Sequence, residues 1–194
     1  MAEAARRPGR PPSGARERVL EAALDVLKSD GYAGLTTAKV AARSGQNKAL
    51  IAYHFGSKQG LVGAAAREVA ESITAEVLDG LERTDSVEEI VRGGLDGLWR
   101  VLERDERLPR VYFDLAAASV AEPEARATMR EMRTLWRTTL EQLLAGAGMS
   151  ARDAEAASVA TIAALDGLAL EWLDRGETPA LERARERIVR GICG

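Results

Sequence analysis

Apolar residues recur every three to four positions along most of this chain, which is the spacing of one face of an α-helix. The repeat begins in residues 13–30 and stops at Gly31. It returns after residue 57, where five apolar residues follow one another at intervals of four: Leu61, Ala65, Val69, Ile73 and Val77. The pattern predicts a first helix over residues 13–30 and a long helix that starts near residue 57 and runs to about residue 81.

Polar caps and helix breakers divide the rest of the chain. Ser86-Val87-Glu88-Glu89 is a capping box that starts a helix. Pro109 and Pro123 suit the first turn of two further helices, because the missing N–H of proline is not needed there. Four residues mark the later ends and starts: Gly146, Gly148, Ser150 and Thr178. We therefore predict an all-α protein with nine helices and no strand.

Charge is distributed unevenly, although the net charge of the 194-residue chain is only −3. Residues 1–58 carry 10 Lys/Arg and 5 Asp/Glu, a net charge of +5. Residues 59–194 carry 17 Lys/Arg and 25 Asp/Glu, a net charge of −8. A basic front on an acidic body is expected if only the N-terminal part meets phosphates.

The composition argues against several kinds of site and location. One cysteine, Cys193, and one histidine, His54, allow neither an internal disulfide nor a metal cluster or histidine-based triad. We expect no metal, no cofactor and no catalytic residues. No apolar run approaches the roughly 18 residues of a membrane span, and the N-terminus has no apolar signal core. The expected location is the cytoplasm, without membrane contact.

Residues 36–61 predict two short helices joined by a glycine turn. Thr36 can cap the first helix, and Ser44-Gly45 can end it because glycine tolerates the left-handed conformation. Asn47 can cap the second helix, which runs to about His54. Four apolar residues can form the buried seam between these helices: Val40, Ala41, Ile51 and Phe55. This is a helix-turn-helix, whose second helix can enter the major groove of DNA.

The same stretch resembles the DNA-binding signature of the TetR family of bacterial transcription regulators. The matching residues are Gly31-Tyr32, Thr36-Thr37, Val40-Ala41, Ser44-Gly45, Tyr53-His54-Phe55, Ser57-Lys58 and Leu61. Two positions depart from the usual pattern, which has an apolar residue in place of Gln46 and a tyrosine in place of Ala52. We assign the phosphate contact of that missing tyrosine to Tyr53. The resemblance implies a helix-turn-helix DNA-binding domain at 13–58 and a helical effector-binding and dimerisation domain at 59–194.

Eight residues of the helix-turn-helix are candidates for DNA contact. Thr37 lies at a helix N-terminus, where its hydroxyl and backbone N–H can meet a phosphate. Side chains at the leading end of the second helix can reach base edges: Gln46, Asn47, Lys48 and Ala49. Three residues at its far end are expected on phosphates: Tyr53, His54 and Lys58. The alternative for His54 is aromatic packing between helices, and the alternative for Lys48 is simple solvation.

Residues 1–12, MAEAARRPGRPP, lack periodic apolar residues and are expected to be a flexible basic arm. The arm is either a mobile terminus or a minor-groove or phosphate contact made by Arg6, Arg7 and Arg10.

The resemblance implies a small-molecule pocket in the second domain, for which the residues themselves give weaker support. Six large apolar or aromatic side chains are candidates, and two charged ones could orient a polar group: Trp99, Tyr112, Phe113, Met129, Met132 and Trp136, with Asp114 and Arg133. The alternatives are plain core for the first six and surface charge for the last two.

The last two helices are predicted to form a dimer face, because apolar residues occur on more than one side of residues 150–175. The residues expected at that interface are Ile162, Leu165, Ala169, Trp172, Leu173, Ile188 and Ile192. A twofold dimer would pair these helices into a four-helix bundle.

Together these features favour a ligand-responsive transcriptional repressor that binds a palindromic DNA operator as a homodimer and is released by an unidentified small-molecule effector. The alternative is a constitutive DNA-binding or helical scaffold protein without an effector. An enzyme is disfavoured, because the sequence has no nucleophile–base pair, phosphate loop or metal-ligand spacing.

Overall fold

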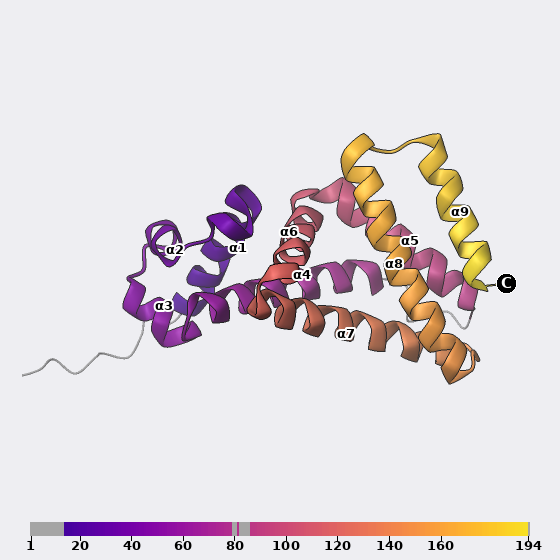
Figure 1. The fold of residues 1–194 in the computed structure, drawn as a ribbon, viewed down its shortest axis with the longest axis horizontal. Helices are drawn as coiled ribbons and strands as arrows, with labels where there is room; N and C mark the ends of the chain where they lie inside the picture. The colour runs from indigo at the N-terminus through magenta and orange to yellow at the C-terminus, as the bar shows by residue number, and fades with distance from the viewer. Residues whose placement is uncertain (1–13, 79–80, 82–85, 194) are drawn as a thin grey trace, which may run out of the picture. The chain divides into compact units, whose positions relative to one another are not determined.

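The computed structural model describes residues 14–78, 81 and 86–193. Within these residues the chain forms nine helices and no strand, which confirms the predicted all-α class (Figure 1). The helices are α1 (Ala15–Gly34), α2 (Thr37–Ser44), α3 (Lys48–Phe55), α4 (Lys58–Leu78), α5 (Val87–Arg104), α6 (Arg107–Ala121), α7 (Pro123–Gly146), α8 (Ala151–Arg175) and α9 (Pro179–Cys193).

The predicted caps start the helices that they were expected to start. Thr36 accepts a hydrogen bond from the Lys39 N–H at 3.2 Å, and Asn47 accepts one from the Leu50 N–H at 2.8 Å. Ser150 does the same for the Asp153 N–H at 3.2 Å. Each of these oxygens satisfies a backbone donor that has no partner within its own helix.

The first helix continues further than predicted. It is interrupted at Gly31, whose φ of 71° and ψ of −179° are not helical, and one more turn then runs to Gly34. Tyr32 is buried in that turn. Glycine therefore kinks the segment rather than ending it, because the turn that follows has an aromatic side chain to bury.

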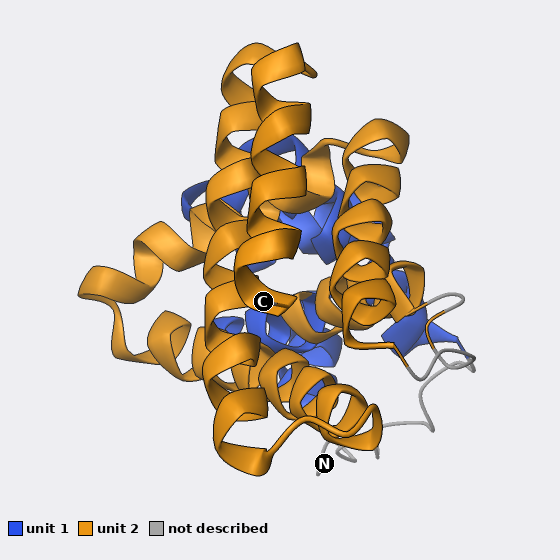
Figure 2. Cartoon of the chain, turned by 90° about the vertical axis from the view of Figure 1, so that its right-hand side faces the viewer, with its two compact units in different colours: residues 1–65 blue, residues 66–194 orange. Residues whose placement is uncertain are grey.

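The chain divides into two compact units, Met1–Ala65 and Ala66–Gly194 (Figure 2). The boundary falls inside α4, beyond the expected domain boundary after residue 58. Leu61 and Ala65 are fully buried, so the first two turns of α4 contribute to a core. The core of the first unit includes Val19, Leu27, Leu35, Val40 and Ile51.

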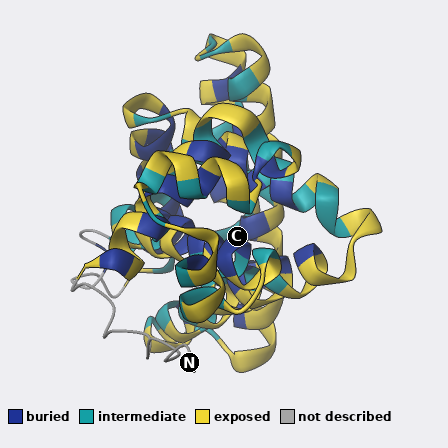
Figure 3. Ribbon diagram, turned by 90° about the vertical axis from the view of Figure 1, so that its left-hand side faces the viewer, coloured by how far each residue is buried: buried dark blue, intermediate teal, exposed yellow. Residues whose placement is uncertain are grey.

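Buried positions alternate with exposed ones along the helices, as expected for helices that pack around a core (Figure 3). Helix α7 packs on α6 and α8, and α5 packs on α8 and α9. One glycine permits a close helix approach: a Cβ added at Gly97 of α5 would lie 2.5 Å from the Cα of Val77 in α4. Ion pairs of 2.5 Å join Arg92 to Glu186 and Asp96 to Arg185, between α5 and α9.

Candidate functional site

The first unit contains the predicted helix-turn-helix, formed by α2, a short turn and α3. Gly45 has φ 66° and ψ 18°, the left-handed conformation that the sequence required at this position. The Gln46 N–H donates to the carbonyl oxygen of Ala41 at 3.2 Å, which closes the turn. Val40 and Ile51 are buried and Phe55 is half-buried, so the two helices share the expected seam.

The four residues at the leading end of α3 differ in what their side chains do. Asn47 uses its side-chain oxygen to cap α3. Gln46 is half-buried, and its side-chain amide donates to the Ser44 carbonyl at 3.4 Å. Lys48 and Ala49 are exposed. Lys48 is therefore the long polar side chain at this end that neither caps the helix nor closes the turn.

The far end of α3 presents Tyr53, which is 72% exposed. Its ring meets His54 edge-on, with 5.1 Å between the centroids. His54 is half-buried, and its Nε2 atom is buried without a hydrogen-bond partner among the described residues. That atom cannot reach a phosphate in this conformation, which supports the packing alternative for part of this side chain.

Two further candidates lie at helix starts. Thr37 is the first residue of α2 and is half-buried. Lys58 is the first residue of α4, and its Nζ lies 5.4 Å from the centre of the Tyr32 ring, a cation–π distance. Ser57 caps this helix by accepting the Gly60 N–H at 3.0 Å. Arg6, Arg7 and Arg10 lie outside the described residues, so the structure gives no account of the arm.

The sequence interpretation passed over Arg43, in the last turn of α2. Its side chain is exposed and donates to the Ser29 hydroxyl at 3.1 Å. Its position next to the glycine turn and its positive charge were the available signals. Lys39, one turn earlier, pairs with Asp30 at 2.8 Å.

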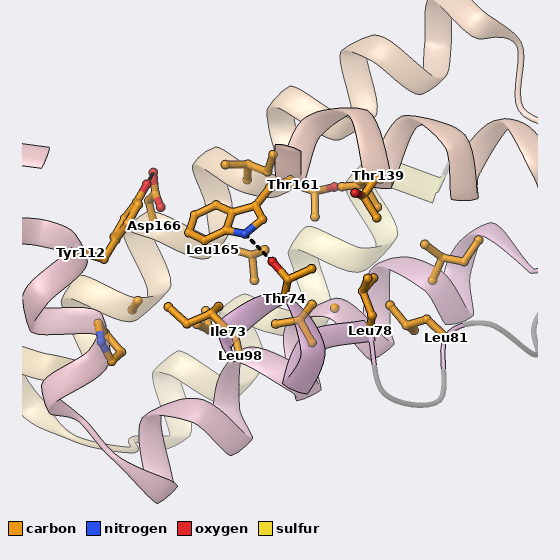
Figure 4. A pocket seen from close by; sticks show the side chains of 18 of the residues that line it. Ile73, Thr74, Leu78, Leu81, Leu98, Tyr112, Thr139, Thr161, Leu165 and Asp166 are labelled. Carbon is orange, nitrogen blue, oxygen red and sulfur yellow. Dashed lines mark hydrogen bonds between the residues drawn. The ribbon is translucent and has the colours of Figure 1, made fainter. Parts of the chain in front are cut away.

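The second unit contains a partly open cavity of about 110 Å³. Helices α4 to α8 all contribute to its wall, which is almost entirely apolar. Figure 4 places Tyr112 and Asp166 at one end of the cavity and Leu78 and Leu81 at the other. The charged residue of the described wall, Asp166, therefore lies at one end of the cavity.

Three side chains form the polar end. Arg133 donates to the Tyr112 hydroxyl at 2.8 Å and also pairs with Oδ2 of Asp166. The Tyr112 hydroxyl donates to the same Oδ2 at 3.3 Å. Burial raises the pKa of Asp166 above its ordinary value despite the opposing effect of Arg133. Burial, followed by the charge of Asp166, raises the pKa of Tyr112 far above its usual range.

The remaining polar groups of the wall are already hydrogen-bonded. The indole N–H of Trp136 donates to the Thr74 hydroxyl at 2.7 Å, the contact drawn in Figure 4. The Thr74 hydroxyl in turn donates to the carbonyl of Ala70 at 2.6 Å. Thr139 and Thr161 donate to carbonyls four residues earlier, at 2.9 and 2.7 Å.

The predicted pocket residues divide into those that line this cavity and those that do not. Tyr112, Phe113 and Trp136 line it, and Arg133 contacts two residues of its polar end. Four others lie elsewhere in the domain: Trp99, Asp114, Met129 and Met132.

Trp99 belongs instead to the core between α5, α8 and α9. Its indole N–H donates to Glu177, and the Arg185 guanidinium lies 4.1 Å from the centre of its ring. Met129 and Met132 are buried on α7, and Asp114 is half-buried on α6. The sequence interpretation missed Asp166 and Thr74 as wall residues, because no local pattern distinguishes a polar residue facing inwards from one facing solvent.

The residues predicted for a dimer face also divide. Ile162, Leu165 and Ala169 line the cavity, so these three do not form the outer surface of α8. Trp172, Leu173, Ile188 and Ile192 are half-buried. The exposed side of α8 carries a different apolar set, which we call the α8 stripe: Val159, Ala160, Ala163, Gly167 and Leu170.

By length and composition α8 is also apolar enough to cross a membrane, with a mean hydropathy of 1.4 over 18 residues. A single such helix is weak evidence for a membrane protein, because helices of soluble cores pass the same test. Here one side of α8 lines the cavity and packs in the core, and the other forms the α8 stripe.

Two family profiles match the chain. The profile described as bacterial regulatory proteins, tetR family, matches residues 19–65. The profile described as BetI-type transcriptional repressor, C-terminal, matches residues 87–193, more than half of the chain. The first covers the helix-turn-helix and the second covers α5 to α9.

Curated relatives and solved structures agree with these profiles. The regulator LmrA of Bacillus subtilis is 29% identical over 86% of this chain and 90% of its own. The regulator BetI of Stenotrophomonas maltophilia is 27% identical over 56% of each chain. A TetR-family regulator from a Rhodococcus species has a TM-score of 0.77 at 22% identity and covers 93% of this chain and 97% of its own. The multidrug binding protein EbrR, complexed with imidazole, has a TM-score of 0.75 at 25% identity, and the match covers 94% of this chain and 91% of the EbrR chain.

Proposed function

Because the chain belongs to the tetR family of bacterial regulatory proteins, we propose that it is a repressor that binds its operator as a homodimer and releases it when a small molecule enters the cavity of the second unit. Members of this family are DNA-binding transcriptional regulators and not enzymes. The observation that carries the ligand-responsive part is the apolar cavity with one polar end.

The helix-turn-helix supplies the DNA-binding surface in this proposal. Lys48 and Ala49 read base edges, and Gln46 takes part only if its amide leaves the Ser44 carbonyl. Tyr53, Lys58 and Thr37 contact phosphates, and Asn47 acts by capping α3. Arg43 joins the phosphate contacts because it is basic and exposed next to the turn.

Similarity to a ligand-binding relative supports the effector. EbrR is described as a multidrug binding protein and has been solved with imidazole and with ethidium. The volume and apolar wall of the present cavity suit a small organic molecule.

Helix α4 is the proposed route from the cavity to the DNA-binding unit. Its second half contributes Ile73, Thr74 and Leu78 to the cavity wall, and its first residue is Lys58. A ligand that contacts the second half therefore acts on the helix that begins next to the recognition helix. The affinity for DNA then falls by the difference in the free energies with which the ligand binds the two states of the protein.

The alternative is a constitutive DNA-binding or helical scaffold protein. This alternative gives the cavity no role. Larger side chains that filled the cavity would stabilise such a protein. We therefore favour the ligand-responsive function.

The test has two steps on the purified full-length protein. Selection from random DNA should give a palindromic sequence with half-sites about one helical turn or somewhat more apart. A small-molecule screen should then find compounds that release this DNA. Recovery of an operator that no cavity-binding compound releases would favour the constitutive alternative. Failure to select any sequence would reject the DNA-binding assignment.

Contacts with phosphates and with bases can be separated on that operator. Lys58→Ala should weaken binding to all sequences alike and reduce the slope of log affinity against log salt concentration by about one. Lys48→Ala should instead change the preference at particular base pairs, at a cost of about 1–3 kcal/mol. A Lys48→Ala protein with unchanged sequence preference would reassign Lys48 to the DNA backbone.

A further inference from the structure

The chemistry of the cavity wall restricts which molecules can bind in it. The wall residues with side-chain N–H or O–H groups are Thr74, Tyr112, Trp136, Thr139 and Thr161. Each of these five donors already has an acceptor, at distances from 2.6 to 3.3 Å. The neighbouring backbone N–H groups of helices α4 to α8 bond within those helices. Among the described residues, the helical part of the wall therefore offers a ligand no donor unless an existing hydrogen bond breaks.

Acceptors are available, and the strongest lies at the polar end. Both Tyr112 and Arg133 direct their hydrogen bonds to Oδ2 of Asp166. In the described structure this leaves Oδ1 of the same carboxylate as the acceptor for a group inside the cavity. A hydroxyl or neutral amine can donate to it, because a carboxylate oxygen accepts more than one hydrogen bond.

The charge balance disfavours ionic ligands of either sign. Asp166 is the one charged residue among the described residues of the wall, and Arg133 already neutralises it from outside the wall. An anion would be buried beside a carboxylate with no donor to solvate it. A cation would have to compete with a guanidinium for a carboxylate that is already paired.

Size and shape restrict the ligand further. A cavity of about 110 Å³ is comparable to the roughly 150 Å³ engineered apolar cavity that holds a benzene molecule. Its two ends differ, with Tyr112 and Asp166 at one and Leu78 and Leu81 at the other (Figure 4). A molecule that fits must be compact and apolar, with its polar group at one end.

We propose that the cavity binds an uncharged, compact, largely apolar molecule that places a single hydrogen-bond donor, such as a hydroxyl, against the Asp166 carboxylate. The proposal deepens the proposed function and rests on it only in treating this cavity as the effector site. The chemical class follows from the wall itself and can be tested by binding alone.

Four probes share an ethylbenzene framework and differ in charge and in hydrogen-bonding group: 3-ethylphenol, ethylbenzene, 3-ethylbenzoate and 3-ethylbenzylamine. Their affinities for the full-length protein are measured by calorimetry at pH 7. We expect 3-ethylphenol to bind most tightly and ethylbenzene about tenfold more weakly, the factor for one hydrogen bond. The anion and the cation should bind about a hundredfold more weakly than the phenol, or not at all. Equal or tighter binding of either ion, equal binding of phenol and ethylbenzene, or no binding by any of the four would overturn the proposal.

Two variants and one matched control locate the binding. A Cβ added at Gly94, on the cavity wall, meets nothing within 4 Å, so Gly94→Leu extends into the cavity and should abolish phenol binding. Gly146→Leu is the matched control, because Gly146 also has open space around it but lies outside the wall. Asp166→Val should remove the advantage of phenol over ethylbenzene while ethylbenzene still binds. Retention of that advantage in Asp166→Val would refute the assigned acceptor.

Release of the selected operator, measured beside ligand binding, distinguishes this proposal from the function on which it rests. Phenol binding in the expected order without any release of the selected operator would support the ligand class and reject the effector role. Release of the operator by charged compounds bound in the cavity, and not by uncharged ones, would reject the ligand class and retain the effector role.

Discussion

At the scale of single residues, Asn47 has two roles that compete for one side chain. Its oxygen accepts the Leu50 N–H at 2.8 Å, so it holds the start of α3 and is not available to an adenine in that conformation. Loss of an N-cap costs about 1 kcal/mol. The structure therefore favours the capping role at a position where the sequence allowed base reading as well.

Asn47→Ala should lower the free energy of unfolding by about 1 kcal/mol, because the start of α3 loses its cap. It should weaken binding to all operator sequences alike. Asn47→Ser keeps the cap and serves as the control, with near-normal stability in urea unfolding. If Asn47→Ser keeps its stability but loses discrimination at one base pair, Asn47 reads bases and the capping assignment is incomplete.

His54 raises a different question, because its Nε2 is buried without a partner among the described residues. An unsatisfied buried polar atom costs about 1–3 kcal/mol. Phenylalanine has a similar shape and no such atom, and it can keep the edge-on contacts with Tyr53 and Phe55. We expect His54→Phe to raise the free energy of unfolding by about 1 kcal/mol.

The comparison with His54→Ala separates packing from DNA contact at this position. The alanine variant should be less stable, because it removes the ring that packs against Tyr53 and Phe55. Operator affinity of His54→Phe, measured beside wild type, then reports any phosphate contact through the other ring nitrogen. A stability of His54→Phe below that of wild type would mean that Nε2 has a partner, such as an ordered water.

The role of a residue could be predicted from the sequence where the groups that it contacts are close to it along the chain. Thr36, Asn47 and Ser150 were identified as caps because a cap bonds to a backbone N–H three residues away. Asp166 was missed in the cavity because its neighbours there, Tyr112 and Arg133, are 54 and 33 residues away in sequence. Its inward position depends on the packing of three helices.

At the scale of helices, α5 contains two buried glycines that should respond to alanine in opposite ways. Gly94 faces the open cavity, whereas a Cβ on Gly97 would lie 2.5 Å from the Cα of Val77. Alanine is favoured over glycine within a helix by about 1 kcal/mol, and overpacking costs about 1–3 kcal/mol.

Gly94→Ala should therefore raise the free energy of unfolding by about 1 kcal/mol, and Gly97→Ala should lower it by at least as much. Urea or thermal unfolding of the two proteins in parallel measures this difference, and each variant is the control for the other because both lie within α5. Equal effects of the two substitutions would contradict the close approach of α5 to α4.

The predicted helices were more reliable than the predicted faces of those helices. Capping residues, prolines and glycines mark the ends of each helix locally, so the nine helices of the described residues were all predicted. For α8 the apolar residues occur on two sides, and periodicity does not say which side faces inwards. The sequence assigned Ile162 and Ala169 to the surface, but they line the cavity, and the α8 stripe lies outside.

At the scale of the whole molecule, the α8 stripe is the surface we expect a second copy of the chain to cover. Val159 and Leu170 are 52% and 51% exposed, and small residues between them would let another helix approach closely. A groove beside the stripe is lined in part by Leu181, Ala184 and Ile188 of α9. Leu181 is buried and Ala184 and Ile188 are half-buried, so the exposed apolar surface is the α8 stripe itself. Contiguous exposed apolar residues mark an interaction surface better than isolated ones do.

Leu170→Glu places a charge on the α8 stripe, so it should raise the dimer dissociation constant about tenfold to a hundredfold, equivalent to about 1.4–2.8 kcal/mol. Val120→Glu is the control, because Val120 is 79% exposed but lies on α6, outside the stripe. Sedimentation of both proteins over a range of concentrations measures the effect. Loss of the dimer should also weaken operator binding, because two half-sites are then no longer bound by one particle. If Leu170→Glu remained dimeric while Val120→Glu became monomeric, the dimer would form through α6 and the α8 stripe would need another partner.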